Sequence, residues 1–363
     1  MKEAILTVSS YTAGTETEGI RLYSFDCETG KPVYHETVVN DKNPSFLAFT
    51  ADRKYAYACQ ELPGEASIRA YRLEEQGRKW HVLNEAMLPG SGMCHITVSP
   101  KEKYLICSNF TAGNIVSCEI LEDGSLGPMG CSVQLQDASV RTDWFQDQSR
   151  CHEAVFSPDG GVMVVANMGG DRLMIYDFDE ESGKISPHLA QKELICDPGD
   201  GPRHHAFSPD GRTMYSVSEI EAAVVVYRYD KYTGTFERIQ KVSTIPEDFV
   251  GWRTASEIMI PRNGKYVLIS NRGFDTIACF ETEADGRLKE TPVYYDSLGQ
   301  ETRMFCLSPD DRFVIIANQK SNRLSVCPFD AETGVIFAPV YTEYVHLPAF
   351  VEVYQIQAGD EDG

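Results

Sequence analysis

Chargeable side chains recur in this chain at a fixed distance before a turn that is repeated six times. The turn resembles Ser-Pro-Asp-Gly, and its central position falls at Ala51, Pro100, Pro158, Pro209, Pro261 and Pro309. Six residues before these turns stand Ser45, Cys94, His152, Arg203, Ala255 and Arg303. Guanidinium and imidazole groups in one such column could bind an anion and move a proton.

Neighbouring positions of the repeat add carboxylates and further basic groups. One residue further along are His95, Glu153 and His204, two residues further is Glu257, and after the second apolar run stand Glu61, Glu219 and Arg272. In a hairpin, the start of the first strand lies beside the end of the second. We therefore expect one small volume to be surrounded by His152, Arg203, Glu219, Glu257, Arg272 and Arg303. Arginine forks suit a carboxylate or phosphate, and glutamate or histidine could take a proton from water.

The same residues could instead form salt bridges and hydrogen bonds between neighbouring repeats. Buried charges cost free energy unless they are paired, and a purely structural centre needs none, so we favour a site. A recurrent asparagine, at Asn109, Asn167, Asn271 and Asn318, is interpreted first as a residue that bonds the backbone of turns. The candidate substrate contacts are His95, Glu257, Arg303 and Asn271.

The pair His204-His205 raises the possibility of a metal site. Adjacent residues of a strand point to opposite faces, however, so we expect His205 to pack or bond in the core. No spacing of histidine and acidic residues matches a zinc or calcium site. We therefore expect no metal and no cofactor.

The elements that position these residues are short strands. Apolar runs flank each turn, and a period of 48 to 58 residues with β-type sequence is typical of a propeller with one blade per repeat. Another alternating strand follows most hairpins, as in Arg172–Asp177, Ala223–Arg228 and Thr276–Phe280. We expect one all-β domain over residues 1–363, a seven-bladed β-propeller of four-stranded antiparallel blades without amphipathic helices.

The two ends of the chain supply the seventh blade in this interpretation. Most of that blade comes from Ala4–Thr12, Gly19–Asp26 and Lys31–Val39. The C-terminal strand Phe350–Gln357 completes it, which closes the ring and removes its open edges. Ala358–Gly363 is expected to be a frayed acidic tail. The long connections Gln134–Gln148 and Ser243–Arg253 are expected where the first strands begin, a position in which loops often line a site.

Composition narrows the classes of partner. The formal net charge of −21 argues against nucleic acid, because phosphate binding needs a basic face, and against an anionic membrane surface. Eleven scattered cysteines without a Cys-x-x-Cys pair fit a reducing cytosol. The apolar run Ala4–Val8 is too short for a signal peptide, and no stretch approaches a membrane span. We expect a cytoplasmic protein, and the sequence leaves its oligomeric state open.

These residues give the chain a resemblance to the lactonase family of seven-bladed propellers, which includes propeller-type 6-phosphogluconolactonase and the fungal carboxy-cis,cis-muconate cyclase. The matching segments cover essentially the whole chain and are Asn43–Ala48, Cys94-His95, His152 before Phe156–Gly160, Gly201–His204, Ser218-Glu219, Ala255–Ile258, Ser270–Gly273 and Ala317–Gln319. Gly-Pro-Arg-His and Ser-Asn-Arg-Gly are the most specific of them.

The resemblance implies an active site of one histidine, two arginines and one glutamate, which by motif fall on His152, Arg203, Arg272 and Glu219. One feature departs from the family. Where His-x-His often precedes the third hairpin, this chain has Arg150-Cys151-His152, so one imidazole is lost and a cation is gained.

The implied activity is hydrolysis of a small anionic sugar lactone, and 6-phosphoglucono-1,5-lactone is the expected substrate. In this hypothesis Arg203 and Arg272 hold the anionic group or polarise the lactone carbonyl. His152 or Glu219 activates water, and Glu257 orients a partner. Two alternatives stay open: action on another lactone, including lactone formation from an unsaturated diacid, and a non-catalytic propeller that serves as a binding scaffold.

Overall fold

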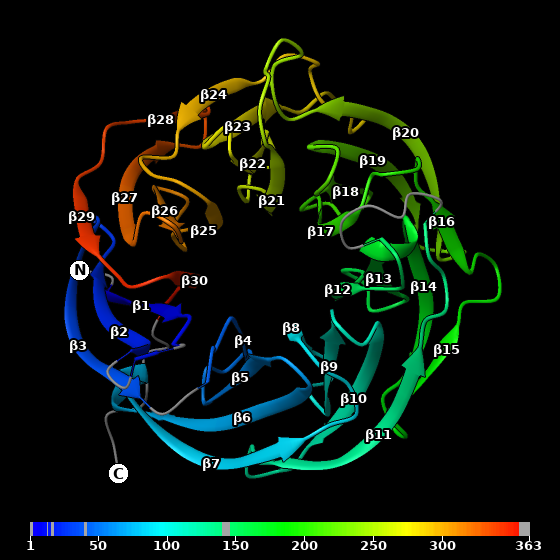
Figure 1. Cartoon of the computed structure of the whole chain (residues 1–363). Helices are drawn as coiled ribbons and strands as arrows, with labels where there is room; N and C mark the ends of the chain where they lie inside the picture. Colours follow the sequence, from blue (N-terminus) through cyan, green and yellow to red (C-terminus); the bar gives the residue numbers. More distant parts are fainter. Residues whose placement is uncertain (1–2, 13, 16–17, 40–41, 140–145, 356–363) are drawn as a thin grey trace.

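Seven antiparallel β-sheets stand around one central axis in the computed structural model (Figure 1). The structure describes residues 3–355 apart from 13, 16–17, 40–41 and 140–145. Each sheet has four strands ordered from the axis outward, and in two sheets a short fifth strand pairs with the third. The predicted seven-bladed propeller of four-stranded blades is confirmed.

The strands fall into four concentric sets. The innermost are β30 (Pro348–Gln355), β4 (Phe46–Phe49), β8 (Met93–Val98), β12 (Cys151–Phe156), β17 (Pro202–Phe207), β21 (Thr254–Met259) and β25 (Thr302–Leu307). The second set is β1 (Glu3–Ser10), β5 (Tyr55–Leu62), β9 (Tyr104–Asn109), β13 (Met163–Asn167), β18 (Thr213–Ser218), β22 (Tyr266–Arg272) and β26 (Phe313–Asn318).

The outer half of each blade is built in the same order. The third strands are β2 (Gly19–Asp26), β6 (Glu65–Glu74), β10 (Asn114–Ile120), β14 (Arg172–Asp179), β19 (Ala223–Asp230), β23 (Thr276–Glu281) and β27 (Arg323–Asp330). The outer strands are β3 (Lys31–Val39), β7 (Lys79–Met87), β11 (Leu126–Gln134), β15 (Lys184–Pro187), β20 (Thr235–Ser243), β24 (Val293–Asp296) and β28 (Val335–Ile336). The short extra elements are β16 (Glu193–Ile195), β29 (Tyr341–Tyr344) and the 3-10 turns η1 (Glu75–Gly77) and η2 (Met168–Gly170).

The repeated turn closes several inner hairpins through its own side chains. Ser157 Oγ donates a hydrogen bond of 2.6 Å to Asp159 Oδ1, and Gly160 has a φ of 68°, a left-handed conformation that glycine adopts readily. The same serine-to-aspartate bond recurs at Ser208 and Ser308. The motif therefore fixes the register of the hairpin at the end remote from the candidate site.

The two ends of the chain close the ring within one blade. Strand β30 pairs antiparallel with β1, from Ala4 opposite Gln355 to Ser9 opposite Phe350. That sheet runs β3-β2-β1-β30, so three N-terminal strands receive one C-terminal strand. The predicted closure is confirmed, with β30 beginning two residues earlier than expected. The expected tail, residues 358–363, lies outside the described residues.

The core lies between neighbouring blades. Large side chains such as Tyr23, Phe25, Phe305 and Phe350 are almost completely buried there. Full burial of one such side chain contributes about 1.5–3 kcal/mol. All eleven cysteines are free thiols, and all but Cys131 are buried. In the described part of the chain, no helix has the length and apolar character needed to cross a membrane.

Candidate active site

A repeated irregularity in the inner strands changes where their first side chains point. In β12 the pairing with β13 skips a residue between Cys151 and Glu153, and in β17 it is interrupted between Pro202 and His205. Similar irregularities occur in β8, β21 and β25. Such β-bulges re-aim side chains near the end of a strand. As a result, the consecutive residues His152 and Glu153 both take part in the central cluster.

Glu219, at the end of the β17-β18 hairpin, is held between two arginines. Its Oε2 lies 2.9 Å from Arg203 Nε, and its Oε1 lies 2.7 Å from Arg272 Nη2. The side chains of Arg203 and Glu219 are only 3% and 8% exposed, and that of Arg272 is 12% exposed. We call this group, with His152 and Arg303, the mouth, because it lies where the inner strands begin.

The guanidinium groups of the mouth keep hydrogen-bonding capacity despite these ion pairs. Arg203 Nη1 donates to the Ser256 carbonyl at 2.9 Å. Arg203 Nε and Arg272 Nη2 face the Glu219 carboxylate, whereas Arg272 Nε is buried and has no hydrogen-bond partner among the described residues. Buried donors without an acceptor are rare in folded proteins and call for an explanation. A bound oxygen atom of an anion or a carbonyl group would satisfy this donor.

His152 stands beside this cluster as a neutral imidazole. Burial, followed by the neighbouring Arg203 and His204, holds the pKa of His152 well below its usual value. Its Nε2 lies 4.0 Å from Glu219 Oε2, and its Nδ1 is buried without a hydrogen-bond partner among the described residues. A neutral imidazole with a free nitrogen can accept a proton from water.

A second layer of titratable groups lies one to two residues further along the inner strands. Glu153 receives the backbone N–H of His205 at 2.6 Å and lies 3.0 Å from His205 Nδ1. His95 Nε2 lies 3.5 Å from the other oxygen of Glu153. Glu257 lies 3.0 Å from His204 Nδ1. All five residues are at most 6% exposed, so this layer is closed off from solvent.

The two carboxyl groups of this layer differ in their proton affinity. Burial raises the pKa of both, but three neighbouring imidazoles outweigh it for Glu153, whose pKa is lowered to about 2. For Glu257 burial prevails over Arg203 and the backbone N–H of Ile258, and raises its pKa to about 7. Glu153 therefore favours its ionised form, whereas Glu257 holds its proton more strongly than an ordinary glutamate does.

Arg303 belongs to a further group on the other side of the mouth. Its Nη2 lies 3.4 Å from Glu61 Oε2, and its guanidinium carbon lies 5.2 Å from the centre of the Tyr11 ring. The Tyr11 hydroxyl donates to the same Glu61 oxygen at 2.7 Å. Arg303 thus supplies a third guanidinium group, from β25, next to Glu61 at the end of β5.

Loops that precede the inner strands are tied to the hairpins by asparagine and aspartate. Asn271 is fully buried, accepts from Thr244 Oγ1 at 2.7 Å and donates to the Thr244 carbonyl at 2.8 Å. Asp171 accepts the backbone N–H groups of Gly199 and Gly201, each at 2.7 Å, and the Gln146 amide at 2.6 Å. These bonds fix the segment that leads into Arg203.

The predicted cluster is largely assembled in the fold, in two layers. His152, Arg203, Glu219, Arg272 and Arg303 lie at the mouth, and His95 and Glu257 lie in the second layer. Asn271 holds the 243–253 connection, which agrees with the backbone-bonding interpretation of the recurrent asparagine, and a substrate contact by it stays a prediction. The other expected long connection includes residues 140–145, which lie outside the described residues.

Sequence reasoning missed the pairings of the second layer. It expected His205 to bond in the core, and His205 does so through Glu153 and the Val164 carbonyl. It gave His204 no partner, although His204 bonds Glu257 from the neighbouring blade. The alternation argument separated the two histidines, yet both Nδ1 atoms lie within 3.9 Å of Glu153 because of the bulge in β17.

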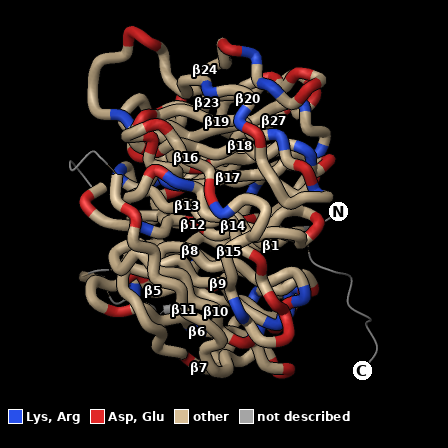
Figure 2. Tube along the Cα trace, turned by 90° about the vertical axis from the view of Figure 1, so that its right-hand side faces the viewer, with Lys and Arg blue, Asp and Glu red and all other residues tan. Residues whose placement is uncertain are grey.

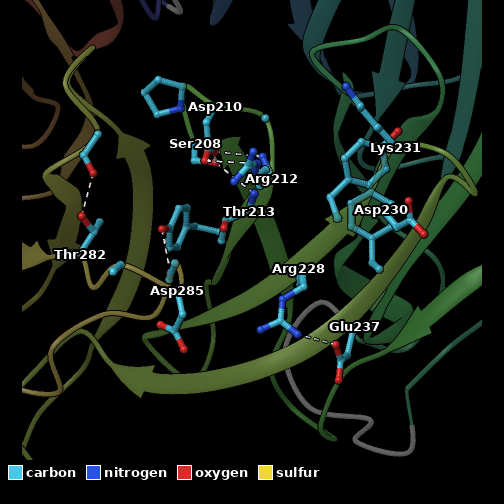
Figure 3. A pocket seen from close by; sticks show the side chains of 18 of the residues that line it. Ser208, Asp210, Arg212, Thr213, Arg228, Asp230, Lys231, Glu237, Thr282 and Asp285 are labelled. Carbon is cyan, nitrogen blue, oxygen red and sulfur yellow. Dashed lines mark hydrogen bonds and ion pairs between the residues drawn. The ribbon is translucent and has the colours of Figure 1, made fainter.

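An open cleft of about 1090 Å³ lies elsewhere, between the β17–β20 and β21–β24 blades at the turn end of their hairpins. Among its polar side chains, Arg228 pairs with Glu237 at 2.9 Å, and Ser208 donates to Asp210 (Figure 3). Acidic and basic segments also alternate over the outer loops of the molecule (Figure 2). Within the described ranges, no group of three or more metal-ligating side chains is arranged to hold an ion. The buried groups of the mouth and second layer remain the strongest candidate site.

Comparison with known proteins identifies the family of this chain. A family model described as "Lactonase, 7-bladed beta-propeller" matches residues 5–353. The 6-phosphogluconolactonase of Bacillus subtilis (strain 168) is 28% identical over 359 residues, which are 97% of this chain and 99% of that protein. The crystal structure of a protein from Lactobacillus plantarum matches with a TM-score of 0.89 at 26% identity, over 97% of this chain and 100% of that one. The periplasmic gluconolactonase of Pseudomonas aeruginosa shares the fold, with a TM-score of 0.91 at 24% identity over 98% and 100% of the two chains.

Proposed function

This chain belongs to the lactonase family of seven-bladed β-propellers, and from that premise we propose that it hydrolyses 6-phosphoglucono-1,5-lactone to 6-phosphogluconate. The relatives named 6-phosphogluconolactonase support the substrate, among them that of Pectobacterium carotovorum, 26% identical over 324 residues. The three guanidinium groups of the mouth suit a substrate with a phosphate group and a lactone carbonyl.

The observation that carries the proposal is the convergence of two buried guanidinium groups, Arg203 and Arg272, beside His152, with Arg272 Nε left without a hydrogen-bond partner among the described residues. Donors held in a site that excludes water stabilise the negative charge that develops on a carbonyl oxygen during attack. The ion pairs with Glu219 involve Nε of Arg203 and Nη2 of Arg272, and they leave Arg272 Nε without a partner among the described residues. A purely structural role leaves this donor unexplained.

In the proposed reaction, a water oxygen forms a bond to the lactone carbonyl carbon while one of its protons passes to His152. Glu219 is engaged by two cations, so His152, with its free nitrogen, is the better proton acceptor. The carbonyl oxygen becomes an oxyanion that Arg203 and Arg272 stabilise. The bond between the carbonyl carbon and the ring oxygen then breaks, the ring oxygen takes up a proton, and the new carboxylic acid ionises.

The test is acid release from freshly generated 6-phosphogluconolactone with wild-type protein and Arg203→Ala. The wild type is expected to accelerate hydrolysis above the spontaneous rate, and the variant to lose roughly a hundredfold or more of that rate, as when one oxyanion donor is removed. Glu237→Gln, at an exposed ion pair in the remote cleft, is the matched control. A wild-type protein that leaves the spontaneous rate unchanged would refute the proposed activity.

A further inference from the structure

His204 and Glu257 form a buried pair in the second layer, and the reaction proposed at the mouth does not use this pair. His204 Nδ1 lies 3.0 and 3.1 Å from the two oxygens of Glu257, which belongs to the next blade. This contact assigns Nδ1 to the carboxyl group and leaves Nε2 as the second nitrogen of His204. That nitrogen is buried and has no hydrogen-bond partner among the described residues. This nitrogen, Nε2 of His204, can therefore accept or release a proton.

The pair is in ring contact with the proton acceptor of the mouth. The His204 ring packs edge-on against His152, with 5.0 Å between ring centres, and against His95 at 5.8 Å. Phe46 covers the same ring at 6.2 Å, so the surroundings are otherwise apolar. The charged or titratable groups that face the pair are Arg203, Glu153, His95, His152, His205, Arg303 and Cys306.

Lactone hydrolysis requires two proton transfers, and a single imidazole can perform only one of them at a time. Water must lose a proton as its oxygen bonds to the carbonyl carbon, and the ring oxygen must gain one as its bond to that carbon breaks. Two equally buried carboxyl groups with opposite pKa shifts, Glu153 and Glu257, are typical of an active site in which acid and base roles are divided.

We propose that Glu257 and His204 form a buried proton carrier that supplies the proton for the departing ring oxygen, in partnership with His152. This role rests on the lactonase activity proposed above. In the first step His152 takes a proton from water, and in the second the pair gives up its own proton by way of His204. The proton on His152 then returns to the pair, and the ionising product releases one proton to solvent. Glu257 acts through His204, so it is a positioning residue.

The pH dependence of turnover tests this role. The pair must carry its extra proton to act, and the pKa of Glu257, near 7, means that this proton is present below pH 7 and lost above it. Wild-type kcat is therefore expected to fall along an alkaline limb centred near pH 7. Glu257→Gln keeps a polar group beside His204 but removes the titrating acid. It is expected to lower kcat roughly a hundredfold at pH 6.5, to leave KM within about threefold, and to abolish that limb.

The control variant Glu237→Gln is expected to retain the wild-type pH profile. A second measurement observes the titration in wild-type protein, so a loss of activity in a misfolded variant cannot mimic the result. Nitrogen NMR of wild-type protein labelled at its eight histidines, with the His204 signals assigned by their absence from His204→Gln, is expected to show the His204 shifts responding to the titration of the neighbouring Glu257 carboxyl group.

The outcomes separate the two proposals. An alkaline limb that is identical in Glu257→Gln and wild type overturns the proton-carrier role, as do His204 shifts that stay constant from pH 6 to 9. Wild-type protein without lactonase activity removes the proposed function and this role with it. Active wild-type protein with an unchanged Glu257→Gln profile removes the role alone.

Discussion

The substitution Glu219→Gln tests whether the mouth is held together by one carboxylate between two cations. Removing one partner of a buried ion pair typically costs about 3–5 kcal/mol, because the remaining charge is left uncompensated. Here Arg203 and Arg272 would both lose their counter-charge, at 2.9 and 2.7 Å. Arg203 would keep its bond to the Ser256 carbonyl, and glutamine would still offer one acceptor oxygen. We therefore expect the lower end of that range, about 3 kcal/mol.

The assay is urea-induced unfolding of wild type, Glu219→Gln and the control Glu237→Gln. The control breaks an ion pair whose side chains are 50% and 70% exposed, so its expected cost is about 0.5 kcal/mol or less. Added phosphate is expected to raise the midpoint of Glu219→Gln more than that of the wild type, because the freed guanidinium groups bind it. Equal midpoints for Glu219→Gln and wild type, or equal protection by phosphate, would refute the reasoning.

Two further substitutions test the groups that support the mouth. Glu257→Gln is expected to stabilise the fold at pH 8 by up to about 3 kcal/mol but not at pH 4.5. The reason is that a carboxyl group whose folded pKa is raised from 4.5 to about 7 destabilises the folded state only above its unfolded pKa. Unfolding measured at the two pH values checks this. Asp171→Asn replaces an acceptor of two backbone N–H groups and is expected to cost about 2 kcal/mol and to lower kcat/KM through displacement of Arg203, which unfolding and kinetic assays measure together.

Much of the architecture could be predicted because local sequence patterns determine it. The turn residues recur with a regular spacing, and several turns close their own hairpin through a short-range bond such as that of Ser157 with Asp159. The closure of the ring followed from counting strands, since an incomplete blade at the N-terminus required one strand from the C-terminus. The convergence of His152, Arg203, Glu219 and Arg272 followed from hairpin geometry, because each residue lies at the same end of its hairpin.

The partners within the site could not be predicted from the same patterns, and the reason is physical. Strict alternation would place His204 and His205 on opposite faces, but one bulge turns both Nδ1 atoms toward Glu153. Whether a carboxyl group then holds a proton depends on contacts between blades. Glu153 meets three imidazoles and Glu257 closely approaches one, which separates their pKa values although both are similarly buried. Bulges and blade contacts therefore decide which histidine faces which glutamate.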